Sequence, residues 1–136
     1  MAHTSASQIA GALLADLEPS EVLTDVDVMV SYLADRATSI VPGTPVAVVR
    51  AARTESVQAV MRVASEHLVP VVPRGAGSGL SGGSTAIEGC IVLSTEAMRD
   101  VSVDAAALTA TVGPGLLNAD LKRAAAEVGL WYPPDP

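Results

Sequence analysis

The first part of the chain carries apolar residues at helical spacing. A short amphipathic helix is predicted from Ser7 to Leu17, with Ser5 or Ser7 as its N-cap and Pro19 just beyond its end. A second helical pattern covers residues 25–36, and residues 38–44 are predicted to form a linker. The apolar faces comprise Ile9, Leu13, Leu14 and Leu17 in the first helix and Val26, Val30 and Leu33 in the second.

Two short apolar runs flank the next helical pattern. Residues 45–50 (PVAVVR) and 70–73 (PVVP) are rich in β-branched residues, which is typical of strands buried on both faces. Between them, Thr54 is expected to cap a helix. A strand, a helix and a strand at this spacing predict a β-α-β unit with parallel strands. The apolar stripe of that helix comprises Val57, Val60, Met61, Ala64 and Leu68.

The pattern changes to alternation after a third apolar run at residues 91–94 (IVLS). Residues 101–104 and 108–112 alternate apolar and polar positions, which predicts an antiparallel hairpin. Residues 116–128 then predict a helix that Gly129 stops. The fold class is therefore α/β (α+β overall), with a small parallel β-α-β lobe followed by the start of an antiparallel second lobe.

Composition and charge restrict the kinds of ligand and partner that the protein is expected to bind. The formal net charge of −7 makes nucleic acid and anionic membranes poor partners, so an anionic ligand must be held by local dipoles. Cys90, the single cysteine, is expected to be a small buried residue. The chain shows no secretory signal, no run of about 20 apolar residues and no metal-ligand spacing, which favours a cytoplasmic protein without a metal site.

The glycine-rich segment of residues 74–83 (RGAGSGLSGG) is the strongest candidate for chemistry. Glycines at alternate positions let consecutive main-chain N–H groups turn inward and form a nest for an anion. The segment follows a predicted strand directly, at the end of a parallel sheet where ligands usually bind. A flexible surface connection is the alternative, and the Arg74 side chain is equally suited to a surface carboxylate or to a cofactor.

Three kinds of phosphate loop are compatible with glycine-rich sequence. A Walker loop is excluded because no lysine follows the glycines. The dinucleotide-binding pattern matches formally at Gly77, Gly79 and Gly82, but it requires a helix to begin there, and residues 82–89 show no helical stripe. The remaining type is a loop whose main-chain amides alone wrap a pyrophosphate.

The segment PVVPRGAGSGLSGG at residues 70–83 resembles the pyrophosphate loop of the vanillyl-alcohol-oxidase-type (PCMH-type) FAD-binding domain. The resemblance runs from about Pro45 to Pro136 and includes ATVGPG at residues 110–115 and the final YPPDP. It is most similar to the branch that holds the glycolate oxidase FAD subunit, D-lactate dehydrogenase and D-2-hydroxyglutarate dehydrogenase. We expect an N-terminal helical segment of residues 1–40 and an incomplete FAD-binding domain of residues 41–136.

The resemblance also implies a cofactor site. Many relatives carry a histidine in the loop that bonds covalently to the flavin, but the matching position here is Ser78, and His3 and His67 lie elsewhere. Non-covalent FAD is therefore expected. The residues implied to bind FAD are Pro73, Arg74, Gly75, Ala76, Gly77, Ser78, Gly79, Leu80, Ser81 and Gly82, with Pro134 and Asp135 near the flavin.

In that family the domain continues with Ile-Gly-Gly and Asn-x-Gly-Gly segments and a substrate domain, which this sequence lacks. We therefore expect a truncated domain, name no catalytic residue, and expect a partner chain or self-association at the open hairpin edges. The resemblance implies an FAD-dependent oxidoreductase in which FAD lies between the two lobes and the complete enzyme oxidises a 2-hydroxy acid such as glycolate or D-lactate. The alternatives are a non-catalytic FAD-binding module or subunit that needs a partner chain, and an inactive truncation.

Overall fold

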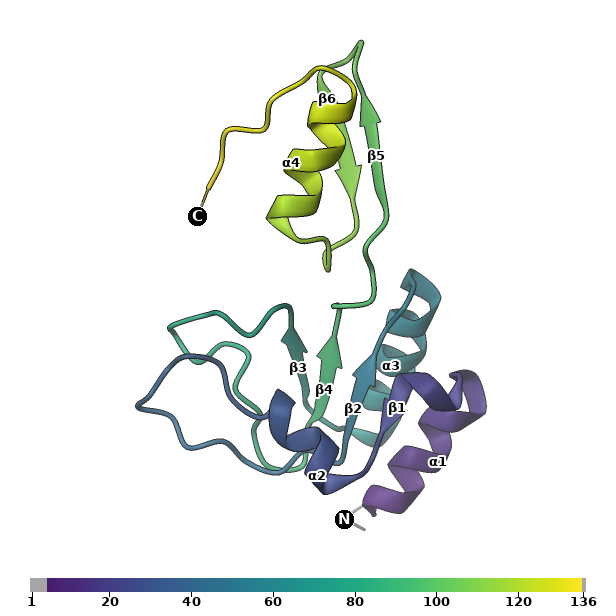
Figure 1. The fold of residues 1–136 in the computed structure, drawn as a ribbon. Helices are drawn as coiled ribbons and strands as arrows, with labels where there is room; N and C mark the ends of the chain where they lie inside the picture. The colour runs from purple at the N-terminus through teal and green to yellow at the C-terminus, as the bar shows by residue number, and fades with distance from the viewer. Residues whose placement is uncertain (1–4, 136) are drawn as a thin grey trace. The chain divides into compact units, whose positions relative to one another are not determined.

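Three parallel strands form the centre of the first part of the chain (Figure 1). The computed structural model describes residues 5–135, which divide into a first unit of residues 5–97 and a second unit of residues 98–135. In the first unit the strands follow the predicted apolar runs. They are β2 (Ala47–Arg50), β3 (Val71–Arg74) and β4 (Ile91–Ser94).

The order of these strands differs from their order in the chain. The sheet runs β1-β2-β4-β3, with β1 (Val22–Leu23) antiparallel to β2. Ile91 of β4 therefore pairs with both Ala47 and Val71. The predicted parallel direction of β2 and β3 is confirmed, but β4 separates them because all four of its residues are buried and suit the centre of the sheet. The two-residue β1 is too short to show a period, and the sequence did not predict it.

Helix α3 (Thr54–His67) connects β2 to β3 and packs on β4. Arg53 is its N-cap, so Thr54 begins the helix instead of capping it as predicted. The predicted apolar stripe is partly confirmed, because Val60 and Ala64 are buried. Met61, however, is 49% exposed, and Leu68, which ends the helix in a left-handed conformation, is 83% exposed. Small side chains allow close packing on the sheet. The buried residues of the helix are Ser56, Ala59, Val60, Val63 and Ala64.

Helix α1 (Ala6–Asp16) packs on α3 and lies one residue earlier than predicted at each end. Ser5 is its N-cap, in a capping box with Gln8. Ile9, Leu13 and Leu17 of the predicted apolar face are buried, whereas Leu14, the fourth member of that face, is 45% exposed.

Glu21 ends the 3₁₀ turn η1 (Pro19–Glu21) as a buried carboxylate that is 6% exposed. Its Oε1 accepts hydrogen bonds from the Ser56 hydroxyl at 2.6 Å and from the Ala52 N–H at 3.0 Å. Burial opposes ionisation of the carboxyl, but these hydrogen bonds, with one from the Glu18 N–H, outweigh it and leave the pKa of Glu21 below its usual value. Glu21 therefore fastens the start of the sheet to the first turn of α3.

The helix predicted over residues 25–36 is wrong. One turn, α2 (Val26–Met29), is followed by the 3₁₀ turn η2 (Val30–Tyr32), and the chain then runs without regular structure to β2. Met29 is buried against the sheet. Of the predicted inner face, Leu33 packs against the core, whereas Val26 and Val30 are 63% and 58% exposed. The Asp35 side chain accepts a hydrogen bond from the Ala37 N–H, a local turn that competes with helix formation.

The second unit consists of a hairpin and a helix (Figure 1). Strands β5 (Val101–Asp104) and β6 (Thr109–Val112) form the predicted antiparallel pair, and α4 (Asn118–Glu127) packs on β5. Gly129 follows α4 with φ +76°, as expected of a glycine that ends a helix. The domain boundary expected near residue 40 stays a prediction. In the part of the chain described, no helix has the length and apolar character needed to span a membrane.

Candidate functional site

The glycine-rich loop of residues 75–84 leaves the sheet at its carboxyl edge. It follows Arg74, the last residue of β3, and Arg74 and Arg50 flank Ser94 in register at the ends of the three parallel strands. No helix begins after Gly82, since residues 83–90 lead through turns into β4. The formal dinucleotide-binding match is therefore accidental, as the sequence indicated, and the loop has its own geometry.

The main-chain N–H groups of this loop are available to a ligand. Within residues 5–135, those of residues 75–81 donate no hydrogen bond to another protein group. Most of these residues are exposed, and Leu80 is 77% exposed. Consecutive free amides at the end of a parallel sheet are suited to an anionic oxygen cluster, because each N–H contributes a fixed partial positive charge.

The glycines of the loop fall into two kinds. Gly77 and Gly82 have φ of +66° and +79°, and a Cβ there would meet the Arg74 guanidinium and the Ile40 side chain respectively. A Cβ on Gly75 or Gly83 would meet nothing within 4 Å, and neither residue has positive φ. The fold therefore requires glycine at 77 and 82, whereas the glycines at 75 and 83 leave open space beside the free amides.

The Arg74 side chain turns back onto the protein. Its Nη1 donates to the carbonyl oxygen of Ala34 at 2.9 Å and to that of Ser84 at 3.5 Å. Its Nη2 donates to the carbonyl oxygen of Ser31 at 3.3 Å. The sequence offered a surface carboxylate or a cofactor as partners of this guanidinium, and the structure instead gives it three main-chain carbonyls.

Asp35 follows Ala34, whose carbonyl oxygen Arg74 binds, and its carboxylate contacts residues at the end of the loop. Its Oδ1 accepts from the Thr85 hydroxyl at 3.1 Å and from the Ala37 N–H at 2.9 Å, and its Oδ2 accepts from the Ser84 N–H at 3.5 Å. The hydrogen bond from Ala37 and then those from Thr85, Ser84 and Gly82 hold the pKa of the Asp35 carboxyl below its usual value, against a smaller effect of desolvation. Asp35 is therefore ionised at neutral pH and joined to the end of the loop.

A third contact holds the same segment to the sheet. The Tyr32 hydroxyl donates to Glu96 Oε1 at 2.7 Å, and the Nε of Arg50 donates to the same oxygen at 2.6 Å. Burial, followed by the hydrogen bond to Glu96, raises the pKa of Tyr32. The Arg50–Glu96 ion pair thus lies at the carboxyl edge of the sheet. Through Tyr32 it holds the start of the segment of residues 31–40, which contacts the loop.

Pro134 and Asp135 belong to the second unit, where both are exposed. The Asn118 side-chain amide donates to the Pro134 carbonyl oxygen at 3.1 Å, and Lys122 Nζ forms an ion pair with Asp135 at 2.8 Å. This ion pair lowers the pKa of Asp135, first through the hydrogen bond and then through the charge of Lys122. Contacts with Asn118 and Lys122 therefore hold Pro134 and Asp135 against α4.

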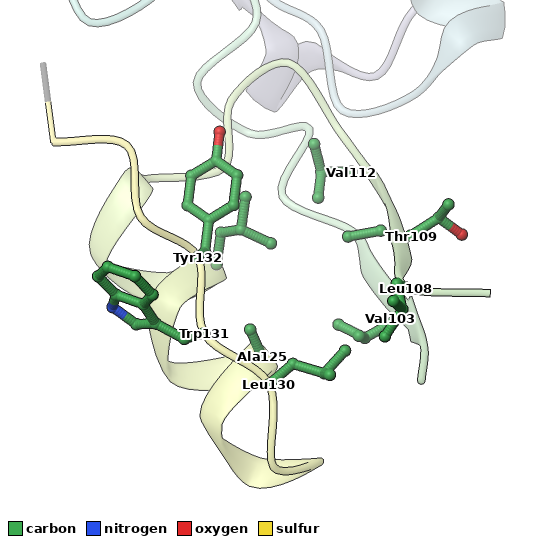
Figure 2. A pocket seen from close by; sticks show the side chains of 10 residues that line it. Val103, Leu108, Thr109, Val112, Ala125, Leu130, Trp131 and Tyr132 are labelled. Carbon is green, nitrogen blue, oxygen red and sulfur yellow. The ribbon is translucent and has the colours of Figure 1, made fainter. Parts of the chain in front are cut away.

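An apolar groove of about 280 Å³ lies in the second unit, between the hairpin and the segment after α4 (Figure 2). Trp131 lines it and is 83% exposed. None of the residues that the sequence singled out for cofactor binding lines the groove. Its lining comprises Val103, Leu108, Thr109, Ala110, Val112, Leu121, Ala125, Leu130, Trp131 and Tyr132.

Of the two histidines, only His67 belongs to the described residues, and it lies away from the loop. His67 ends α3, which returns to the amino edge of the sheet before β3 begins, whereas the loop lies at the carboxyl edge. His3 lies outside the described residues. Cys90 is fully buried and burial raises the pKa of its thiol, which confirms it as a packing residue. Among residues 5–135, no three His, Cys, Asp or Glu side chains gather as metal ligands would.

The apolar pattern gave no indication that residues 31–40 belong to the site. It assigned these residues to a helix and a linker, although they supply Asp35 and the carbonyls that Arg74 binds. One local signal was available. An aspartate followed after one position by the small residues Ala37, Thr38 and Ser39 is typical of a turn in which the carboxylate accepts a main-chain N–H. The partner at Thr85 is fifty positions away and gives no local signal.

Comparison with known proteins identifies a family that includes the residues of this site. Residues 45–136 match a protein family described as an FAD binding domain. The chain is 43% identical over 93 residues to the glycolate oxidase subunit GlcD of Bacillus subtilis, covering 68% of this chain and 20% of that protein. It is 37% identical over 120 residues to the D-2-hydroxyglutarate dehydrogenase of Stutzerimonas stutzeri, covering 88% of this chain and 26% of that protein.

Solved structures show the same fold. An alkyldihydroxyacetonephosphate synthase superposes with a TM-score of 0.86 at 19% identity, covering 98% of this chain and 27% of that one. At this identity the likeness concerns the fold alone. The chain spans about a fifth to a quarter of the length of the curated relatives it matches.

Proposed function

Because the chain belongs to the FAD binding domain family, we propose that its glycine-rich loop holds the pyrophosphate of FAD within an FAD-dependent oxidoreductase of 2-hydroxy acids. The observation that carries this proposal is the run of main-chain N–H groups at residues 75–81 that donate to no protein group among the described residues. A pyrophosphate offers several anionic oxygens to such a run. The open space beside Gly75 and Gly83 leaves room for it.

The residues of the loop would have different roles in binding the pyrophosphate. The amides of Gly75, Ala76, Gly77, Ser78 and Gly79 would contact the phosphate oxygens, with Leu80, Ser81 and Gly82 beside them and Pro73 before them. The Arg74 guanidinium would act indirectly, since it is engaged by main-chain carbonyls. With a net charge of −7 on the protein, these local dipoles have to supply the attraction for the dianionic pyrophosphate. Pro134 and Asp135 would lie near the flavin.

We propose that the FAD is bound without a covalent bond. Ser78 stands at the loop position where relatives with a covalent flavin carry histidine. His67 ends α3 at the opposite edge of the sheet. The flavin supplies the hydride-accepting ring when it is bound. The chain's own contribution is to hold the dinucleotide and orient it.

The substrate class follows from the relatives. One is named a glycolate oxidase subunit and the other a D-2-hydroxyglutarate dehydrogenase, and both names refer to 2-hydroxy acids. We therefore propose glycolate, D-lactate or a similar 2-hydroxy acid as the electron donor of the whole protein. A second candidate is an FAD-binding module that acts with a partner chain, which is favoured by the description of the Bacillus subtilis relative as a subunit. Turnover of glycolate or D-lactate with a dye acceptor distinguishes the enzyme from the module.

Gly75→Ala tests the loop directly. Because a Cβ at this position meets nothing within 4 Å, the free energy of unfolding should change by no more than about 0.5 kcal/mol. FAD affinity, measured by equilibrium titration of flavin fluorescence, should fall at least about tenfold as the methyl group enters the phosphate's place. Gly11→Ala in α1 is the matched control, because its Cβ also meets nothing and it is far from the loop in sequence. Unchanged FAD affinity in Gly75→Ala would show that phosphate does not bind here.

A further inference from the structure

The shape of the glycine-rich loop depends on residues that precede the sheet. The Arg36 N–H donates to the Gly79 carbonyl oxygen at 2.9 Å, and the Ala86 N–H donates to the Leu33 carbonyl oxygen at 2.8 Å. These two main-chain hydrogen bonds join residues 33–36 to the middle of the loop and to Ala86, just after its end. They run between segments that are separated by more than forty positions, so they form only in the folded chain.

Side chains reinforce the same contact. The Thr85 hydroxyl accepts from the Asp35 N–H at 3.3 Å and donates to Asp35 Oδ1 at 3.1 Å, and Thr85 itself is only 4% exposed. The Ser84 N–H donates to Asp35 Oδ2 at 3.5 Å. A carboxylate that receives hydrogen bonds from a buried hydroxyl and from the loop's main chain fixes where the loop turns back. Tyr32 and Arg74 secure the segment at its other end.

The positions of the glycines agree with this contact. A Cβ on Gly79 would approach Asp35 Oδ2 to 3.4 Å, and a Cβ on Gly82 would run into Ile40. These two glycines therefore make room for residues 31–40 and not for a ligand. Gly75 and Gly83, which face open space, remain for the ligand. The loop has an inner side that contacts residues 31–40 and an outer side that is free.

We propose that Asp35 is a positioning residue for FAD binding, which shapes the free amides of residues 75–81 by anchoring Thr85 and Ser84. This inference rests on the proposed function of the loop. Asp35 does not contact the cofactor in this scheme. Its carboxylate holds the loop in the binding conformation before FAD arrives, so that ordering the loop costs less free energy on binding.

Three variants test the proposal. Asp35→Ala removes both acceptor oxygens, whereas Asp35→Asn keeps an oxygen for Thr85 and Ala37 and should restore most of the binding. Thr85→Val removes the hydroxyl that donates to Asp35 and changes the side-chain volume little. It tests the same contact if Asp35→Ala does not fold. Asp104→Ala is the matched control, because Asp104 Oδ1 also accepts two main-chain N–H groups at 3.0 Å, from Ala106 and Ala107, in the hairpin of the second unit.

Two measurements separate positioning from general stability. In the flavin-free protein, amide exchange at Arg36 and Ala86, followed by NMR, should accelerate in Asp35→Ala and Thr85→Val but not in Asp104→Ala. In parallel, FAD affinity should fall about tenfold in the first two variants, recover in Asp35→Asn and stay unchanged in Asp104→Ala, because the loss of internal hydrogen bonds typically costs a free energy equivalent to about that factor.

The outcomes distinguish this inference from the proposed function. If Gly75→Ala weakens FAD binding while Asp35→Ala and Thr85→Val leave the affinity unchanged, the loop binds FAD and the positioning role is wrong. If Gly75→Ala and the Asp35 variants all leave FAD affinity unchanged, the loop is not the FAD site. The proposed function of the loop and the positioning role of Asp35 are then both wrong. An equal loss of affinity in Asp104→Ala would attribute the effect to stability and would overturn the specific role of Asp35.

Discussion

The guanidinium of Arg74 donates a 2.9 Å hydrogen bond to the carbonyl oxygen of Ala34, forty positions earlier in the chain. This contact places the last residue of β3 against residues 31–35 and leaves the loop after it with its outer face free. Arginine at this position therefore belongs to the support of the loop. Its charge still contributes to the local field at the carboxyl edge of the sheet.

Gly77→Val should abolish FAD binding. The positive φ of +66° strains any β-branched residue, and the new side chain would meet the Arg74 guanidinium and displace it from its carbonyl partners. We expect a loss of stability of about 1–3 kcal/mol and no retained flavin. The measurements are urea unfolding and the ratio of flavin to protein after purification. Gly129→Val, at φ +76° in the second unit with nothing within 4 Å, controls for backbone strain and should keep the flavin.

The flavin released from the whole protein should be FAD. The loop offers amides for two phosphates, whereas FMN carries only one, so the dinucleotide is the better match. Acid precipitation should leave the flavin in solution and chromatography should identify it. Flavin that stays with the precipitate, or FMN alone in the supernatant, would contradict non-covalent pyrophosphate binding.

Glu21→Gln should weaken the first unit in a pH-dependent way. The folded-state pKa of Glu21 is lowered, so the unfolded chain binds more protons and the ionised carboxylate stabilises the fold. This contribution is complete above the unfolded pKa of about 4.3 and is lost as the pH falls through the lower folded value.

Urea unfolding at several pH values checks this prediction. At pH 7 the variant should lose about 1–3 kcal/mol, because the amide cannot serve all the donors that Glu21 accepts. The difference between wild type and variant should shrink below pH 4. A difference that is independent of pH would mean that the charge of Glu21 contributes nothing.

The fluorescence of Trp131 should report an exposed indole. Trp131 is the single tryptophan, and it is 83% exposed at the edge of the apolar groove. Acrylamide should quench it in the native protein almost as efficiently as in urea. Strong protection from quenching in the native protein would show that another surface covers the groove. Trp131→Ser should change the free energy of unfolding by no more than about 0.5 kcal/mol.

Sequence by itself determined the secondary structure wherever the apolar pattern was long or unambiguous. The runs at residues 45–50, 70–73 and 91–94 became β2, β3 and β4, and the alternation at residues 101–112 became the hairpin. Short branched side chains in an unbroken run have few alternatives to a buried strand. The glycine-rich loop and its family resemblance were equally evident, because glycine spacing is a property of the chain alone.

Only the tertiary structure decided which surfaces meet. It placed β4 between β2 and β3, turned Ser56 and Ala59 of α3 inward in place of Met61, and broke the helix expected over residues 25–36. It also joined Asp35 to Thr85 across fifty positions. Such contacts depend on close packing and on distant hydrogen-bond partners, and neither leaves a period in the sequence. The free amides of the loop follow from the sequence, whereas the contacts that hold their shape exist only in the fold.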